Sequence, residues 1–174
     1  MAHEHFNGEP TEPTPSERAE LWRKVEKVRL AMLTTHDRDG AFTSRPLTTQ
    51  QAEASGVLWF FIPVDGGIAE ELGRDPRLLL NYADLSDNFF VALSGTGQVL
   101  KDAAKAHELW SPMAGAWFPQ GERDPNLALL RVDVDKAEYW DPGSSKLVQL
   151  FAIARAALTH TPPHNVGEHR EFRS

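Results

Sequence analysis

Residues 42–68 of the chain read FTSRPLTTQQAEASGVLWFFIPVDGGI. The first part is rich in hydroxyl side chains and holds one arginine, Arg45, whereas the second part holds the apolar run from Val57 to Ile62. Two such segments joined by a short polar stretch that ends in a glycine predict a β-hairpin. Its two ends differ chemically: one carries hydroxyl and guanidinium donors suited to a phosphate, and the other carries aromatic side chains.

Donors at one end of a hairpin and aromatic walls at the other fit a nucleotide-like cofactor such as flavin mononucleotide (FMN). The donors would be Ser44, Arg45, Thr48 and Thr49, and the ring platform would come from Trp59, Phe60 and Phe61. A purely structural interpretation stays open beside this one. Aromatic residues in a strand more often fill the core, and an arginine in a strand more often lies at a solvated edge.

The composition is that of a single globular domain with a substantial core. The chain has 174 residues, of which 41% are apolar and 25% are charged. Its net charge of −7 disfavours binding to nucleic acid or to an anionic membrane. The absence of cysteine excludes disulfides, thiolate metal sites and a cysteine nucleophile. The acidic, proline-rich start resembles no signal peptide and no run is apolar enough to span a bilayer, so we expect cytoplasmic residence.

The order of periodic segments predicts an α+β barrel. We expect a disordered tail over 1–15, a folded domain over 16–159 and a flexible tail over 160–174. About seven short strands follow one another with short links, which favours antiparallel pairing over an alternating βαβ fold. The predicted strands are 30–35, 41–50, 57–62, 77–83, 88–94, 127–134 and 137–140, and the predicted helices are 17–28, 68–73, 103–110 and 146–158.

Three further segments have more than one interpretation. Gly95-Thr96-Gly97 is a weak match to a phosphate loop, and a bulge where a barrel closes explains it better. The long segment 111–126 could cover a ligand, form a subunit contact or cap its own core. The D-x-D-G fragment at 37–40 lacks the later glutamate of a calcium loop, and the tail histidines are too irregular for a site, so we expect no metal.

Several segments together resemble the general stress protein branch of the pyridoxamine 5′-phosphate oxidase-like proteins. They appear in the order and approximate spacing of that family, and the resemblance covers roughly residues 17–159. The segments are LAMLTT at 30–35, SRP at 44–46, LWFF at 58–61, LSGTG at 93–97, LW…AWFP at 109–119, ALLRV at 128–132, EYWD at 138–141 and SSKLVQL at 144–150.

The resemblance implies a split β-barrel with flanking helices and a homodimer that binds FMN in a groove at the dimer interface. By position, Arg45, Ser44 and Thr48 would hold the phosphate or ribityl chain, and the backbone of Pro46 and Leu47 would lie beside the flavin ring. Phe60 and Phe61 would line the site. Trp117, Trp140 and Gln149 would approach from the later half of the chain, from the second subunit.

Two positions depart from the family pattern. Ile62 stands where the family usually has a threonine, and Ile68 stands where it usually has a phosphate-binding lysine. Losing one charge-assisted contact of roughly 1.5–3 kcal/mol weakens binding about ten- to a hundred-fold. Backbone amide groups at Gly67 and Ile68 could replace part of that contact. The sequence therefore leaves a weakened or lost FMN site open.

The resemblance implies a flavin-dependent redox protein that takes electrons from a donor such as a reduced nicotinamide. Synthesis of pyridoxal phosphate is not expected, because the sequence lacks a basic cluster for a second phosphate. A non-catalytic module that binds or senses a flavin or another small molecule is the alternative. A deazaflavin reductase on a related barrel is a third option.

Overall fold

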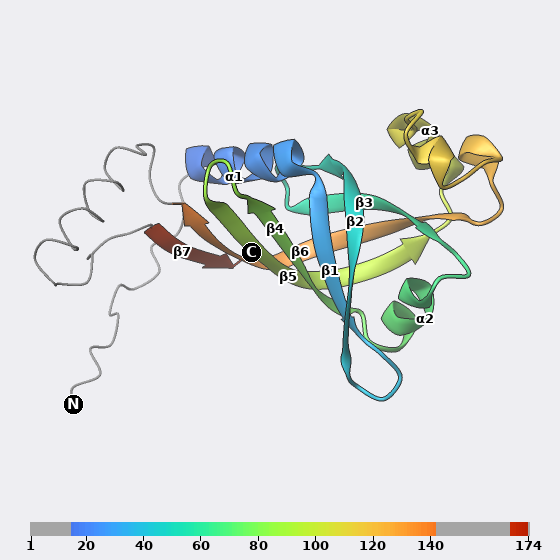
Figure 1. Ribbon diagram of the computed structural model, residues 1–174, viewed down its shortest axis with the longest axis horizontal. Coiled ribbons are helices and arrows are strands. Elements are labelled where there is room, and N and C mark those ends of the chain that lie inside the picture. The colour runs from blue at the N-terminus through green and yellow to red at the C-terminus, as the bar shows by residue number, and fades with distance from the viewer. Residues whose placement is uncertain (1–14, 142–167, 174) are drawn as a thin grey trace, which may run out of the picture.

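The computed structural model describes residues 15–141 and 168–173. Figure 1 shows a strongly curved sheet with short helices at its ends. The elements are α1 (Pro15–Val28), β1 (Leu30–His36), β2 (Phe42–Ala52), β3 (Val57–Pro63), α2 (Gly67–Arg74), β4 (Arg77–Asp84), β5 (Phe89–Leu100), α3 (Ala103–Leu109), the 3₁₀ turns η1 (Ala114–Ala116) and η2 (Gly121–Arg123), β6 (Leu127–Asp141) and β7 (Glu168–Arg173).

The strands form one antiparallel sheet that closes into a barrel. Its order is β3-β2-β1-β4-β5-β6-β7, and a further pairing of β3 with β6 joins the two sides, so that β7 extends the sheet beyond the closed part. Each pair of neighbouring strands is antiparallel. The predicted split β-barrel with flanking helices is confirmed.

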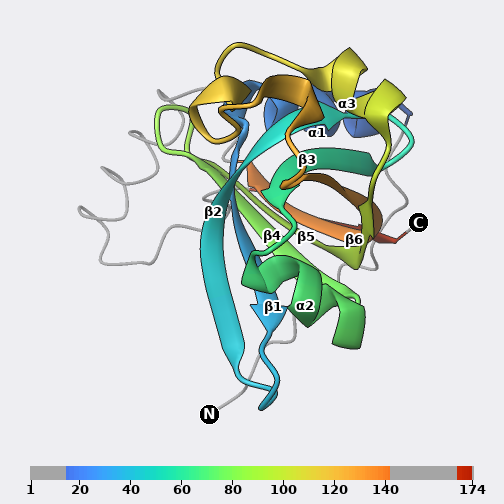
Figure 2. The same ribbon diagram turned by 90° about the vertical axis from the view of Figure 1, so that its right-hand side faces the viewer.

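Side-chain alternation places the core inside this barrel. In β1 and β4, every second residue is buried, as expected for strands with one face on a core. Helix α1 covers one end of the barrel with Leu21, Trp22 and Val25, and α2 covers the other end with Ile68 and Leu72. Figure 2 shows α2 across the lower end, beside β1 and β5.

A bulge bends the longest strand pair. Ser94 pairs with Lys136 but Gly95 pairs with Val134, which leaves Asp135 as the extra residue on β6. A Cβ atom on Gly95 would lie 2.1 Å from the carbonyl oxygen of Asp133, so only glycine allows this approach. The bulge predicted from the Gly-x-Gly segment is confirmed. The two last strands of the prediction, 127–134 and 137–140, are instead one strand that continues through the bulge.

The ends of the chain were predicted less well. Part of the expected flexible tail, residues 168–173, forms β7 and pairs with β6. The predicted helix at 146–158 and residues 1–14 of the predicted tail over 1–15 lie outside the described residues, and Pro15 begins α1. In the part of the chain that the structure describes, no helix is long and apolar enough to cross a membrane.

Candidate functional site: an open strand edge beside an anion cradle

Five of the predicted site residues, Ser44 to Thr48, lie on an open edge of the barrel. Strand β2 pairs with β1 from Phe42 to Thr48, but its pairing with β3 begins only at Thr49. Over residues 43–48, β2 therefore has a strand neighbour on one side alone within the described ranges. Pro46, which has no N–H group to donate, is tolerated at such an edge. The backbone of this segment is the part of the barrel wall that a ligand can approach sideways.

Alternation along β2 sends neighbouring site residues to opposite faces. Ser44 and Pro46 are exposed and lie across from Thr34 and Met32 on the outside of the barrel. Thr34 Oγ1 donates a hydrogen bond of 3.1 Å to Ser44 Oγ. The alternate residues, Arg45 and Leu47, turn inward. Arg45 lies opposite Leu33, and Leu47 packs against the core. The structure therefore brings Ser44, Pro46 and Thr48 together on one face and Arg45 and Leu47 on the other.

Arg45 belongs to a compact group of donors, the anion cradle, made by the side chains of Thr35, Thr43 and Arg45. Arg45 Nη2 donates to Thr43 Oγ1 at 2.5 Å and to Thr35 Oγ1 at 3.3 Å. A carboxylate from α2 occupies the cradle, because Glu71 Oε2 lies 2.6 Å from Arg45 Nη2 and accepts from Thr35 Oγ1 at 2.5 Å. The Arg45 and Glu71 side chains are 26% and 12% exposed. The group therefore lies at the surface of the barrel end, partly shielded from water.

The glycine turn before α2 forms one wall of the cradle. A Cβ atom on Gly67 would lie 3.5 Å from Arg45 Nη1 and 3.3 Å from Glu71 Oε1. Gly66, at the N-cap position of α2, has no side chain to satisfy the first amide groups of the helix. Gly67 therefore lies against Arg45, and its predicted role in binding a cofactor stays a prediction. Ile68 instead turns into the core with Leu72 and is 5% exposed.

The aromatic run of β3 divides in the same way. Phe60 and Ile62 are completely buried inside the barrel, where no surface remains for a ligand. Phe61 points outward into a second apolar cluster, with its ring 5.8 Å from Trp110 and 6.3 Å from Phe118. Both clusters are core packing, so within one chain this run supplies no exposed ring platform.

The tryptophans from the later half of the chain lie apart from each other. Trp117 follows η1 and is 81% exposed, whereas Trp140 lies near the end of β6, opposite Phe90, and is 39% exposed. Figure 1 places the α3–η2 segment and this end of β6 at opposite ends of the barrel. Gln149 lies outside the described residues.

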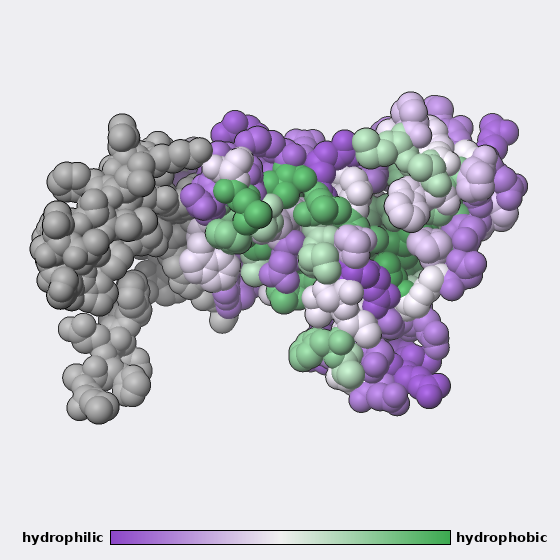
Figure 3. Space-filling view, in the orientation of Figure 1, coloured by the Kyte–Doolittle hydropathy of each residue, from purple (hydrophilic) through white to green (hydrophobic). Residues whose placement is uncertain are grey.

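The outside of the barrel carries an apolar surface next to the open edge. Met32 lies between Pro46 and Asn81 across the sheet, and Leu79 lies opposite Thr34 one pair further along. Figure 3 shows hydrophobic side chains gathered over β1 and β4 on this side. We call this surface the outer apolar face; its large side chains are those of Leu30, Met32, Leu79, Phe90 and Trp140, each at least 36% exposed.

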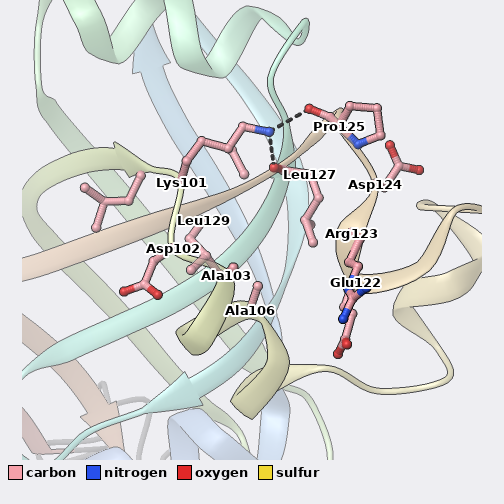
Figure 4. A pocket seen from close by; sticks show the side chains of 12 residues that line it. Lys101, Asp102, Ala103, Ala106, Glu122, Arg123, Asp124, Pro125, Leu127 and Leu129 are labelled. Atoms are coloured by element: carbon pink, nitrogen blue, oxygen red, sulfur yellow. Dashed lines mark hydrogen bonds between the residues drawn. The ribbon is translucent and has the colours of Figure 1, made fainter.

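A separate cavity of about 360 Å³ lies between the start of α3 and the η2–β6 connection (Figure 4). Its lysine, Lys101, points across it and donates to the carbonyl oxygens of Pro125 at 2.6 Å and Leu127 at 2.5 Å. Lys101 thus holds the connection in place, and none of the predicted site residues that the structure describes lines this cavity. Among the described residues, no group of three or more His, Cys, Asp or Glu side chains could hold a metal ion.

Comparison with known proteins places the fold in a family. The family profile described as "Pyridoxamine 5'-phosphate oxidase like" matches residues 16–164. The chain belongs to the pyridoxamine 5′-phosphate oxidase-like family. The predicted family is therefore confirmed, because the matched residues include β2 and every strand of the closed barrel.

Two solved structures illustrate the similarity. The general stress FMN/FAD binding protein from Xanthomonas citri is 34% identical with a TM-score of 0.66, over 77% of this chain and 94% of that chain. A protein from Jannaschia sp. CCS1, assigned as general stress protein 26, is 26% identical with a TM-score of 0.74, over 92% of this chain and 100% of that chain. Protein bli-3 of Neurospora crassa is 22% identical over 144 residues, which is 77% of this chain and 69% of bli-3.

Sequence analysis of this family member missed two residues of the cradle, Thr35 and Thr43, and the carboxylate that occupies it, Glu71. Thr43 could have been found from alternation, because it shares a strand face with Arg45. Thr35 follows once β1 is paired with β2, since Thr35 lies directly opposite Thr43. Glu71 gives no such signal, because its position depends on where α2 lies against the barrel.

Proposed function

We propose that this protein binds FMN along the open edge of β2, between two copies of the chain, and serves a redox role of the general stress type. The observation that carries the proposal is the open edge itself: a backbone segment with a strand on one side alone, bordered by donors and by an apolar surface. The 34% identical Xanthomonas citri protein, described as FMN/FAD binding, supports the choice of ligand.

The residues around the edge fit such a ligand. The backbone of Pro46 and Leu47 would lie along the ring, and Ser44 and Thr48 would contact the ribityl chain from the outer face. Arg45, with Thr35 and Thr43, would hold the phosphate, because a guanidinium and hydroxyl groups are strong donors to phosphate oxygens. A bound flavin would supply the ability to accept a hydride or electrons, for which a reduced nicotinamide is the proposed donor.

The outer apolar face supports the homodimer. Several large apolar side chains on neighbouring strands form a continuous exposed surface, of the kind that marks an interaction site on a soluble protein. The face adjoins the open edge through the pair Met32–Pro46, so a second copy seated there would close over the edge. In that arrangement the later half of a second copy would approach the site, and Trp140, which lies on the outer apolar face, would reach it more readily than Trp117 at the opposite end of the barrel.

A non-catalytic binding module is the second candidate, and one observation favours it. Ile62 and Ile68, which replace the threonine and lysine usual in the family, are both buried in the core. These positions therefore present no polar group to a ligand, so the chain relies on fewer side-chain contacts for it. A flavin held this way could be stored or sensed without turnover.

The test is a visible absorption spectrum of freshly purified protein, followed by addition of a reduced nicotinamide under anaerobic conditions. A flavin band that bleaches supports the redox role, and a band that stays supports the binding module. Colourless protein that rejects added FMN contradicts both candidates. Sedimentation analysis of the same sample checks for the dimer, and a monomer that retains flavin would contradict a site between two copies. Cytoplasmic residence stays a prediction.

A further inference from the structure

We propose that Glu71 occupies the phosphate site of its own chain, so that the phosphate of FMN must displace it and the site discriminates little between FMN and unphosphorylated riboflavin. The inference rests on the proposed flavin function but concerns one carboxylate. It makes Glu71 a specificity-determining residue.

The contacts of Glu71 are those of an anion in a binding site. Its Oε2 atom accepts from Thr35 Oγ1 at 2.5 Å and Arg45 Nη2 at 2.6 Å, and it lies 3.3 Å from Thr43 Oγ1. These three side chains come from two neighbouring strands and converge on one oxygen atom. The same donors would suit a phosphate oxygen equally well. The carboxylate therefore shows that the cradle can hold an anion and where that anion lies.

The position of Glu71 on α2 explains how the carboxylate reaches the cradle. Side chains of a helix lean toward its N-terminus, so Glu71 reaches back over the turn that begins at Gly67. The hypothetical Cβ of Gly67 would lie 3.3 Å from Glu71 Oε1, which confirms this path. The first amide groups of a helix favour anions, so a phosphate in the cradle would also face the N-terminus of α2. The side chain and the ligand would compete for the same space.

Competition of this kind removes the gain in binding affinity that the phosphate of FMN would otherwise provide. The charge of Arg45 is already balanced by Glu71, and a phosphate that entered beside the carboxylate would meet a like charge. A charge-assisted contact to phosphate ordinarily contributes about ten- to a hundred-fold in affinity. In the wild-type protein, that gain is largely cancelled by the loss of the Arg45–Glu71 pair.

The experiment compares FMN with riboflavin, which differ only in the phosphate. Dissociation constants are measured by flavin fluorescence for the wild type, Glu71→Gln and Glu70→Gln. Glu70→Gln is the matched control, because it removes the same charge from the same helix at an exposed residue paired with Arg74 rather than with the cradle. Glu71→Gln should tighten FMN binding about ten- to a hundred-fold and leave riboflavin unchanged. Glu70→Gln should change either affinity by no more than about fivefold, the size of an exposed charge effect.

Each result has a defined meaning. The wild type alone tests the proposal without any variant: FMN binding more than about a hundred-fold tighter than riboflavin overturns it. An unchanged FMN-to-riboflavin ratio in folded Glu71→Gln, or an equal shift in Glu70→Gln, also overturns it and shows that Glu71 only fixes α2.

Inorganic phosphate separates this inference from the proposed function. Millimolar phosphate should raise the melting temperature of Glu71→Gln more than that of the wild type or of Glu70→Gln. If no variant binds either flavin but phosphate raises the melting temperature of Glu71→Gln the most, the proposed flavin function is wrong. The inference that Glu71 competes with an anion for the cradle is then still supported. If flavins bind and neither phosphate nor FMN distinguishes the variants, the function stands and the competing carboxylate fails.

Discussion

Replacing Tyr82 with phenylalanine should destabilise the barrel by about 1–3 kcal/mol. The Tyr82 hydroxyl and Thr49 Oγ1 lie 2.8 Å apart in the barrel interior, and each residue is 2% exposed. The substitution removes one partner and leaves the Thr49 hydroxyl in an apolar environment. A buried polar group without a partner costs its full desolvation free energy, which exceeds the net value of the hydrogen bond itself.

Removing both hydroxyls should cost less than removing one. Thr49→Val has nearly the same shape as threonine, so the double variant with Tyr82→Phe replaces the polar pair with apolar groups. We expect the double variant to be less destabilised than Tyr82→Phe alone, with a coupling free energy of about 1 kcal/mol between the two sites.

Urea unfolding, followed by tryptophan fluorescence, measures these free energies. All proteins are compared at one concentration, because association of copies would otherwise change the apparent stability. Burial raises the pKa of the Tyr82 phenol above its ordinary value of 10.0, and the hydrogen bond with Thr49 partly offsets this. A raised pKa means that the stability due to Tyr82 is complete below pH 10 and declines above it, as the unfolded chain ionises first. A Tyr82→Phe variant within about 0.5 kcal/mol of the wild type, or a double variant that costs the sum of both, would refute the reasoning.

Three further predictions follow from other parts of the barrel. Met32→Glu on the outer apolar face should weaken the proposed dimer at least about tenfold in sedimentation analysis, because it buries an unpaired charge, whereas Ala19→Glu on exposed α1 should not. Gly95→Ala should cost more than about 3 kcal/mol in urea unfolding, because its Cβ would overlap a backbone carbonyl of β6. The hydrogen bonds from Arg77 lower the pKa of Asp75 below its ordinary value of 3.8, so Asp75 stabilises the fold above that pH and less as the pH falls. The difference in melting temperature between the wild type and Asp75→Asn should therefore shrink in acid, and a constant difference would contradict this role.

Most of the barrel could be predicted because its strands have local signals. The strand Arg77–Asp84 alternates between buried and exposed residues, and its short apolar run before polar Asn81 predicts a strand, although the exposed Leu79 hides the period in the sequence. The run Val57–Pro63 is apolar on both faces because the barrel core lies on one side and the α3–η1 cluster on the other. A continuous apolar run predicts a buried strand without showing what buries each face.

The errors concern features that depend on distant parts of the chain. The strand Leu127–Asp141 looked like two strands because the polar pair Asp135-Lys136 interrupts its pattern. The interruption is a bulge whose position is set by Gly95 on the neighbouring strand. The strand at 168–173 has a polar sequence, and it exists through pairing with the last part of β6. Local propensity carries no information on such a pairing.

The predicted site shows the same division between local and distant information. The sequence placed Ser44, Arg45, Pro46, Leu47 and Thr48 in one site, although a strand must send alternate side chains to opposite faces. These residues can share one ligand only because β2 lacks a partner strand on that side until Thr49. A ligand along a free edge meets the backbone in front, Ser44 and Pro46 on one side, and Arg45 on the other. The open edge would therefore reconcile the alternation with the single proposed site, in which the ligand would run along β2 with its phosphate toward α2, where Glu71 lies.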